Sequence, residues 1–282
     1  MTLASGALVQ RLLPQRFLCR CIYRLARTRV GWIKKPLIKW FGRHYRIDMN
    51  EAEHARAEDY GTFNEFFTRA LRPGVRPIDA GADSIVAPCD GTLMEFGVLE
   101  RDRMLQAKGM TYTLTALLGE DSAEVERFID GTYATIYLAP RDYHRVHVPV
   151  AGRLLRASYI PGDRFSVNGA TARAVPNLFC RNERVVCWLE ADLGQVAVVL
   201  VGALNVSSIS VTTRGEIPSG PAHTWRTPEL VQLRKGAELG RFNLGSTVIV
   251  LFPRGAIRWD ERLARGDRLL MGARIGRALT TH

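Results

Sequence analysis

The first 47 residues contain no aspartate or glutamate, although the chain of 282 residues carries 28 acidic side chains. The same stretch holds eleven lysines and arginines, whereas residues 48–282 balance 28 basic against 28 acidic side chains. The net charge of +11 therefore belongs to the N-terminal segment alone. A charge excess confined to one arm predicts an anionic partner for that arm.

Three further absences narrow the class of protein. The sequence has no apolar run of 18 residues, which excludes a transmembrane helix on length. It has no Cys-x-x-Cys pair, and its five cysteines are unevenly spaced, which argues against a cysteine zinc site and a disulfide-built secreted domain. It also lacks Gly-x-Ser-x-Gly, the motif of the α/β-hydrolase nucleophile. The chain has 282 residues, of which 46% are hydrophobic, so it can bury a core without disulfides or a structural metal.

Residues 15–29 are predicted to form an amphipathic helix that begins near Pro14. Arginines recur at steps of four, four and three residues, which places them on one face, and apolar side chains fill the other. The basic face comprises Arg16, Arg20, Arg24 and Arg27, and the apolar face comprises Phe17, Leu18, Cys21, Ile22 and Leu25. Trp32 and Trp40 follow among further lysines.

Basic amphipathic helices with tryptophan on the apolar side are typical of the membrane interface. Each Lys or Arg near an anionic surface contributes about 1 kcal/mol to binding. We therefore interpret residues 1–47 as basic amphipathic membrane-binding helices. A solvated charged face, a nucleic-acid-binding arm, an organellar transit peptide and packing of Trp32 and Trp40 against the body remain the alternatives. A secretory signal fits badly, because arginines interrupt its apolar region.

The rest of the chain predicts helices followed by strands. Residues 48–72 are expected to be helical, with Asp48 and Thr62 as candidate N-caps, each followed by a glutamate three residues later. Pro73-Gly74 is expected to end this region. Beyond residue 84, short runs between turn signals predict strands. These are Gly91–Phe96, Thr132–Leu138, His144–Val150, Arg153–Ile160, Arg184–Glu190, Gln195–Leu204, Ser207–Thr213 and Thr247–Phe252.

Only one helix, Leu114–Leu118 with its flanks, is expected among these strands. The predicted fold class is therefore α+β, with N-terminal amphipathic helices followed by a mainly antiparallel β body like a barrel or sandwich.

Three local features carry the residue types needed for nucleophilic catalysis. They are Asp90 in a turn before a strand, His144 and His147 in one segment, and Ser246 after Gly245. On a strand the two histidines point to opposite faces, so no metal site is expected from them. Each feature alone is weak, but together they supply the carboxylate, imidazole and hydroxyl that activate a serine. Because Gly245 has no side chain, its carbonyl is open to attack by Ser246.

Further segments make the sequence similar to the phosphatidylserine decarboxylase family, whose proenzymes generate their own pyruvoyl group. The matching segments include Thr62–Phe67, Arg76–Asp79, Gln106–Gly109, Tyr143–His147, Pro161–Asp163, Phe165–Asn168, Pro176–Phe179, Arg181–Arg184, Val201–Ala203 and Leu244–Thr247. Cys89 departs from the alanine expected beside Asp90, and residues 213–242 match less well and receive no site.

The resemblance implies a role for each candidate residue. Asp90 would orient and stabilise His147, which would take the hydroxyl proton of Ser246. Ser246 would attack the Gly245 carbonyl and become a covalent pyruvoyl group. Its ketone would form a Schiff base with the substrate amine, so that phosphatidylserine loses CO2 and becomes phosphatidylethanolamine. His144 is the candidate that protonates the α-carbon or contacts substrate, with His147 as the other possibility.

The resemblance also implies how the molecule is organised. Residues 48–245 would form the remainder of the β chain, and residues 246–282 an α chain completing the same β body. The two chains would stay together as a heterodimer, and a homo-oligomer of such heterodimers remains open. The expected partners are an anionic phospholipid membrane and phosphatidylserine, with no nucleic acid and no metal, and the expected location is the cytoplasmic side of the cell membrane, as a peripheral protein.

Two other functions are consistent with the same residues. A membrane-lipid serine hydrolase would use Ser246, His147 and Asp90 with an intact hydroxyl. A non-catalytic membrane or nucleic-acid binding module would not depend on Ser246 at all.

Overall fold

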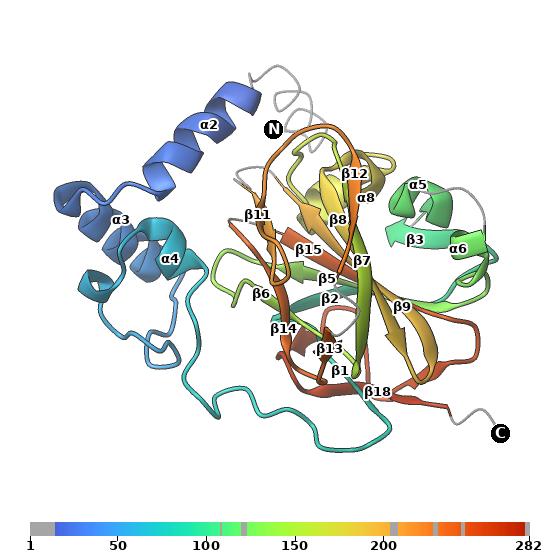
Figure 1. The fold of residues 1–282 in the computed structure, drawn as a ribbon. Helices are drawn as coiled ribbons and strands as arrows, with labels where there is room; N and C mark the ends of the chain where they lie inside the picture. Colours follow the sequence, from blue (N-terminus) through green and yellow to red (C-terminus); the bar gives the residue numbers. More distant parts are fainter. Residues whose placement is uncertain are drawn as a thin grey trace.

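A computed structural model describes residues 15–279 apart from 108, 120–122, 204–207, 228–230 and 244–245 (Figure 1). Gly245, one half of the predicted cleavage site, therefore lies outside the described residues. So do residues 1–14 of the predicted arm and residues 280–282 of the predicted α chain. The described chain forms a group of helices beside a larger β body, and a long connection joins the two (Figure 1).

The largest sheet positions the candidate serine. Its strands are β2 (Gly91–Val98), β5 (Thr132–Leu138), β7 (Gly152–Ile160), β8 (Arg184–Ala191), β9 (Gly194–Gly202), β12 (His223–Arg226), β13 (Gln232–Leu233), β15 (Ser246–Phe252) and β17 (Arg268–Leu269). They are antiparallel in the order β12-β7-β8-β9-β15-β5-β2-β17, and β13 also pairs with β7. Strand β15 is thus an interior strand, between β9 and β5, and all seven of its residues are buried.

Three smaller sheets complete the body. Four strands in the order β11-β10-β14-β6 form one sheet, three in the order β1-β18-β16 form another, and β3 and β4 form a pair. Their bounds are β1 (Ser84–Val86), β3 (Arg103–Ala107), β4 (Met110–Thr113), β6 (Arg145–His147), β10 (Ile209–Val211), β11 (Gly215–Ile217), β14 (Glu238–Phe242), β16 (Ile257–Trp259) and β18 (Arg274–Ala278). The predicted α+β class is confirmed, and the sheets are sandwich-like, with no closed barrel among the described strands.

Most predicted strands are present with small shifts at their ends. The strand Thr132–Leu138 is found with the predicted bounds. The predicted strand His144–Val150 is shorter, since β6 ends at His147 and Pro149 has no N–H for a ladder. The ends predicted at Leu204 and Ser207 lie outside the described residues.

Short helices are more frequent in the body than expected. The predicted helix α5 (Leu114–Leu118) is confirmed. The helices α6 (Ala123–Glu126), α7 (Gly169–Ala172) and α8 (Leu178–Arg181) contradict the expectation of only one. Each has four residues, which is too short to show a helical period in the sequence.

The N-terminal arm contains two of the expected helices, α2 (Gln15–Ala26) and α3 (Gly31–His44). The first ends three residues before its predicted end at residue 29. Helix α3 continues through Pro36, which removes one hydrogen bond near the start of the helix without ending it.

The expectation that residues 48–72 are helical is wrong for most of that segment. Only the 3₁₀ turn η1 (Ala57–Asp59) and the short helix α4 (Phe63–Phe67) form there. The cap at Thr62 is confirmed, because its side chain accepts a hydrogen bond from the backbone N–H of Glu65 at 3.1 Å. Asp48 starts no helix; its side chain accepts from the backbone N–H of Asn50 at 2.9 Å, which is a local turn contact.

The helices share a small hydrophobic core of their own. Its buried members are Ala26, Ile38, Tyr60, Phe63, Phe66 and Phe67. A hydrogen bond also joins α3 to the segment before α4, since the buried Lys34 Nζ donates to the carbonyl of Tyr60. Helices α2 and α3 of the arm therefore pack with α4 as one unit, beside the larger core of the β body.

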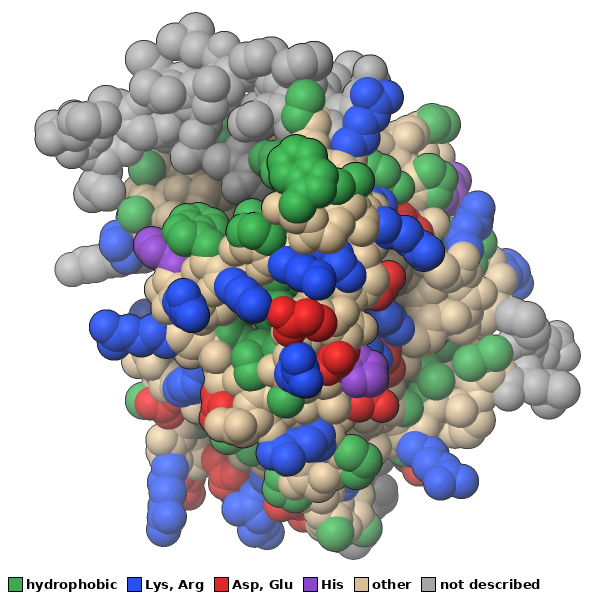
Figure 2. Space-filling model, turned by 90° about the vertical axis from the view of Figure 1, so that its left-hand side faces the viewer, with side chains coloured by type: hydrophobic (Ala, Val, Ile, Leu, Met, Phe, Trp, Pro, Cys, Tyr) green, Lys and Arg blue, Asp and Glu red, His purple; other side chains and the backbone are tan. Residues whose placement is uncertain are grey.

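The outer side of this unit displays apolar rings among basic groups. The side chain of Trp32 is 80% exposed and that of Trp40 is 57% exposed. Figure 2 shows hydrophobic side chains standing among Lys and Arg on this face. This exposure disfavours the alternative that both tryptophans pack against the body. No helix among the described residues is long and apolar enough to cross a bilayer.

A glycine before β5 tests the close packing of the central sheet. A Cβ at Gly131 would lie 2.3 Å from the carbonyl oxygen of Phe252 and 2.7 Å from that of Phe128. Since backbone atoms cannot rotate away, we expect Gly131→Ala to lower the free energy of unfolding by about 3 kcal/mol. Thermal unfolding measures the loss. Gly220→Ala is the control, because a Cβ there meets nothing within 4 Å; equal stability of the two variants would contradict the packing argument.

Candidate active site

Ser246 is the first residue of the interior strand β15 and is completely buried. Its backbone is paired with Leu138 on one side and Gly202 on the other. Residues 248–252 of the strand are all apolar, which explains why the sequence folds there as a strand buried on both faces. The ladder therefore fixes the position of the serine from both sides.

His144 is the imidazole next to this serine. Its Nδ1 lies 3.5 Å from the Ser246 Oγ, at the outer limit of a hydrogen bond. The ring is fully buried and stacks on Phe67 of α4, with ring centroids 4.0 Å apart. Burial, helped by the charge of Arg69, lowers the pKa of His144 to about 3, while the carbonyls of Ala139 and Pro140 oppose the shift. His144 is therefore neutral at pH 7.

His147 lies at the end of β6 and has different neighbours. Its Nδ1 is 2.8 Å from the carbonyl oxygen of Gly236, and its Nε2 is 3.1 Å from the hydroxyl of Tyr143. Since a carbonyl only accepts, the proton belongs on Nδ1, and Nε2 is left to accept from Tyr143. Burial lowers the pKa of His147, while Gly236 O, Glu238 and Asp90 oppose the fall.

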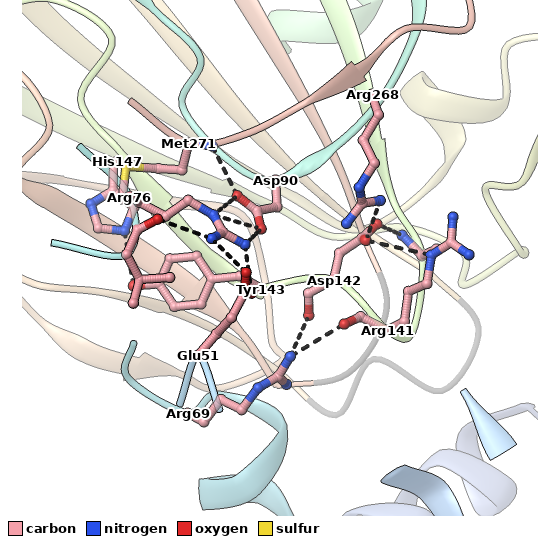
Figure 3. A network of polar contacts seen from close by, with 12 residues as sticks. Glu51, Arg69, Arg76, Asp90, Arg141, Asp142, Tyr143, His147, Arg268 and Met271 are labelled. Carbon is pink, nitrogen blue, oxygen red and sulfur yellow. Dashed lines mark hydrogen bonds and ion pairs between the residues drawn. The ribbon is translucent and has the colours of Figure 1, made fainter. Parts of the chain in front are cut away.

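Asp90 lies in the turn before β2 and is almost fully buried. Arg76 Nη2 donates to its Oδ2 at 2.7 Å, and Arg76 Nε lies 3.0 Å from its Oδ1. The backbone N–H of Met271 donates to Oδ1 at 2.8 Å. Arg76 also donates to Glu51 at 2.8 Å, so that one guanidinium joins two carboxylates (Figure 3).

This arrangement keeps the Arg76 guanidinium charged. Burial disfavours the charged form, but the hydrogen bonds that Arg76 donates to Asp90 and Glu51 outweigh it and raise the pKa of Arg76. Removing either partner of a buried ion pair leaves an uncompensated charge. The turn of Asp90 is thus held by residues from three other parts of the chain.

A second carboxylate shapes the loop that leads to the histidines. The Asp142 Oδ2 accepts from the backbone N–H of Ala139 at 2.7 Å, and Oδ1 lies 2.8 Å from Arg268 Nη1. The backbone carbonyls of Arg141 and Asp142 face the buried Arg69 Nη2 at 3.2 and 3.5 Å. Between Asp142 and Asp90 lies a cavity of about 210 Å³, lined largely by arginines and carboxylates (Figure 3).

The structure brings together some of the predicted residues and not others. Ser246 and His144 are adjacent, and the turn of Asp90 is tied to β6 by a hydrogen bond from the His147 N–H to the Pro88 carbonyl at 2.7 Å. The imidazole of His147, however, has Gly236 and Tyr143 as its hydrogen-bond partners, and the carboxylate of Asp90 has Arg76 and Met271. The roles of Asp90, His147 and His144 therefore stay predictions.

Arg76, Glu51 and Tyr143 are site residues to which sequence reasoning gave no role. Arg76 and Tyr143 stand in segments that carry the family resemblance, which was the available signal. Glu51 was expected to cap a helix at Asp48, and it pairs with Arg76 instead. Among the described residues, no three His, Cys, Asp or Glu side chains gather as a metal site would require.

An α+β chain that buries a serine beside an imidazole, at the start of an interior antiparallel strand, has a candidate serine-centred site. Comparison with known proteins identifies the family of the chain. Residues 63–277 match the model of the family described as phosphatidylserine decarboxylase, and residues 6–46 match a second model described as PSD. The chain belongs to the phosphatidylserine decarboxylase family.

Similar proteins span almost the whole chain. It is 46% identical to a phosphatidylserine decarboxylase proenzyme of Ectopseudomonas mendocina over 96% of this chain and 97% of that protein. A protein of the same name from Azotobacter vinelandii is 47% identical over 95% and 96% of the two chains. One from Methylibium petroleiphilum is 48% identical over 94% of each.

The buried neutral His144 predicts a loss of stability in acid. The unfolded chain protonates this histidine below about pH 6.5, but the folded chain does so only near its pKa of about 3. Stability therefore falls as the pH falls through this interval, because the unfolded state binds more protons. We expect His144→Asn to remove about 2 kcal/mol of the loss between about pH 7.5 and about pH 5.

Urea unfolding at the two pH values measures this difference. In the His144→Asn variant, His147 still contributes to the loss of stability in acid, because burial lowers its pKa as well. An unchanged pH dependence in His144→Asn would mean that His144 has the same pKa in the folded and the unfolded chain, which contradicts its shift by burial.

Proposed function

We propose that this protein is a self-cleaving, pyruvoyl-dependent decarboxylase that converts phosphatidylserine to phosphatidylethanolamine and CO2. The observation that carries the proposal is Ser246, which is fully buried at the start of β15, directly after a glycine and 3.5 Å from an imidazole. Its hydroxyl has no exposed surface through which to meet an outside ester, whereas its own preceding peptide is always within reach. Membership of a family whose relatives are named proenzymes adds support.

Self-cleavage needs only atoms of the chain and one water. The Ser246 Oγ attacks the carbonyl carbon of Gly245, and an N-to-O acyl shift leaves an ester. Loss of the Ser246 α-proton expels the Gly245 carboxylate and leaves a dehydroalanine. Water then hydrolyses this enamine to a ketone and releases ammonia. The products are residues 1–245 and a 37-residue chain that begins with a pyruvoyl group at position 246.

We assign the proton transfers to the two histidines. Two carboxylates, Asp90 and Glu238, favour the charged form of His147, whereas the charge of Arg69 disfavours that of His144. A group with a pKa near 3 is a weak base at neutral pH. His147 is therefore the better acceptor for the Ser246 proton, with Asp90 acting on it by charge, although the two groups must approach each other during cleavage. His144 holds the hydroxyl and later protonates the substrate α-carbon.

The surroundings of Ser246 fit a pyruvoyl group. The position is buried, the backbone on both sides is paired, and the ring of His144, which stacks on Phe67, lies beside it. There the ketone would supply the Schiff base with the substrate amine and the electron sink that decarboxylation requires. The protein's own part is to exclude water and to hold a neutral imidazole at this position.

The alternative of a membrane-lipid serine hydrolase using Ser246, His147 and Asp90 has less support. Such an enzyme needs its serine open to the substrate, and Ser246 is completely covered in the uncleaved chain. The motif that exposes a hydrolase nucleophile is also absent from the sequence.

We also propose that residues 1–47 bind an anionic phospholipid membrane and hold the protein peripherally on the cytoplasmic side. The exposed rings of Trp32 and Trp40 lie on the same helix as Lys35 and Lys39, which suits a surface of apolar and anionic groups. The substrate lipid belongs to that surface, so the arm brings the site to its substrate. The two chains produced by cleavage would remain a heterodimer within one β body.

Intact mass under denaturing conditions tests the self-cleavage. The native sequence is expected to yield two chains, the smaller with 37 residues and a blocked N-terminus, and Ser246→Ala a single chain of 31.5 kDa. Because one water is gained and one ammonia lost, the two masses should exceed the intact chain by about 1 Da together. Simple hydrolysis would add about 18 Da.

Two further variants separate the histidines in the same experiment. His147→Ala is expected to leave the chain uncleaved, whereas His144→Ala is expected to cleave and to lose decarboxylation of phosphatidylserine. A native chain that stays whole in the presence of membranes, with an activity lost in Ser246→Ala, would favour the hydrolase instead.

The membrane proposal predicts that the exposed tryptophans contribute to binding. We expect the double variant Trp32→Ala, Trp40→Ala to weaken binding to vesicles containing phosphatidylserine by at least about tenfold, since each ring loses apolar contact with lipid. Sedimentation with vesicles measures the change. Val98→Ala is the control, because Val98 is an exposed apolar side chain of the β body. Unchanged binding of the double variant, or a preference for nucleic acid over vesicles, would refute the proposal.

A further inference from the structure

Asn243 lies three residues before Ser246, and its side chain is bonded at both ends. Its Nδ2 donates to Ser208 Oγ at 2.8 Å and to Ser210 Oγ at 3.1 Å. Its Oδ1 accepts from Asn64 Nδ2 at 3.0 Å, and its backbone N–H donates to the Ser208 carbonyl at 3.0 Å. Asn243 is 3% exposed, so these bonds are shielded from water. It is a fixed point just ahead of the predicted cleavage site.

Asn64 reaches this point from the helical unit and not from the β body. It lies on α4, the helix that also stacks Phe67 on His144 at 4.0 Å. Directly after α4, the carbonyl of Thr68 accepts from Arg145 Nε at 3.0 Å. One short helix therefore contacts both the segment before Ser246 and the imidazole beside its hydroxyl.

A second helix reaches the same network. Arg27, just after α2, forms an ion pair with Glu216 at 2.8 Å and lies 3.4 Å from Ser208 Oγ. Ser208 Oγ donates to Glu216 at 2.7 Å and accepts from Asn243. The helical unit thus meets the surroundings of Asn243 at two independent places.

We propose that Asn64 is a positioning residue for self-cleavage, because it holds Asn243 and with it the chain that enters Ser246. This inference rests on the proposed self-cleavage. Consecutive Cα atoms are about 3.8 Å apart, so the Cα of Asn243 lies at most about 11 Å from that of Ser246, and a shift of one residue bears on the other. Releasing Asn243 would let the chain that leads to Ser246 sample more conformations, which lowers the population of the reactive geometry. Small misplacements of reacting groups cost up to about a hundredfold in rate.

The test follows cleavage of the full chain after a pulse of cell-free synthesis with vesicles present. Asn64→Leu keeps the size of the side chain and removes its hydrogen bond to Asn243, and is expected to slow cleavage by about tenfold or more. Asn64→Gln keeps the amide donor and is expected to restore most of the rate. Asn50→Leu, at an exposed position of the same N-terminal region, is expected to cleave at the native rate.

Thermal unfolding separates positioning from a general loss of stability. Measured in chains that also carry Ser246→Ala, Asn64→Leu is expected to unfold within a few degrees of its parent. Cleavage of Asn64→Leu at the native rate, or a Gln variant as slow as the Leu variant, would overturn the proposal. So would a loss of stability large enough to account for the slower cleavage. If the native chain itself is not cleaved, the proposed function fails and not this inference alone.

Discussion

The pairing of Arg76 with Asp90 is the interaction on which the geometry of the site depends. It places a carboxylate in the interior, where an unpaired charge would cost about 3–5 kcal/mol. Arg76 comes from the connection after the helical unit, Asp90 from the turn before β2 and Glu51 from a segment ahead of α4. The same carboxylate receives the Met271 N–H near the end of the chain. One charge pair therefore joins parts of the chain that are far apart in sequence.

Local sequence patterns predicted the parts of the fold that local chemistry controls. The strand Thr132–Leu138 and the helix Leu114–Leu118 have the predicted bounds, because alternation, apolar runs and capping residues suffice there. The helix expected to begin at Asp48 does not form, and Glu51, its expected capping partner, pairs with Arg76 instead. A long-range contact thus overrode a correct local preference, which no periodicity reveals.

The candidate site was predictable in its residue types and not in its partners. The pattern and the family resemblance singled out Asp90, His144, His147 and Ser246, whereas their neighbours follow from the tertiary fold. Asn64 and Asn243 are 179 positions apart, and their hydrogen bond exists only because α4 packs against the β body. The same packing buries His144 against Phe67, and burial is what lowers its pKa to about 3. Chemistry at this site is thus a property of the assembled fold.

The place of Ser246 in the sheet has a consequence for maturation. A newly made chain end is ordinarily the loosest part of a protein, since nothing precedes it. Here the proposed cleavage would leave the new N-terminus at the first residue of β15, which pairs with Leu138 on one neighbouring strand and with Gly202 on the other. The pyruvoyl group would therefore form at a position whose backbone is already fixed by the folded sheet. Folding would come first and the cofactor second, so that an unfolded copy never acquires the chemistry.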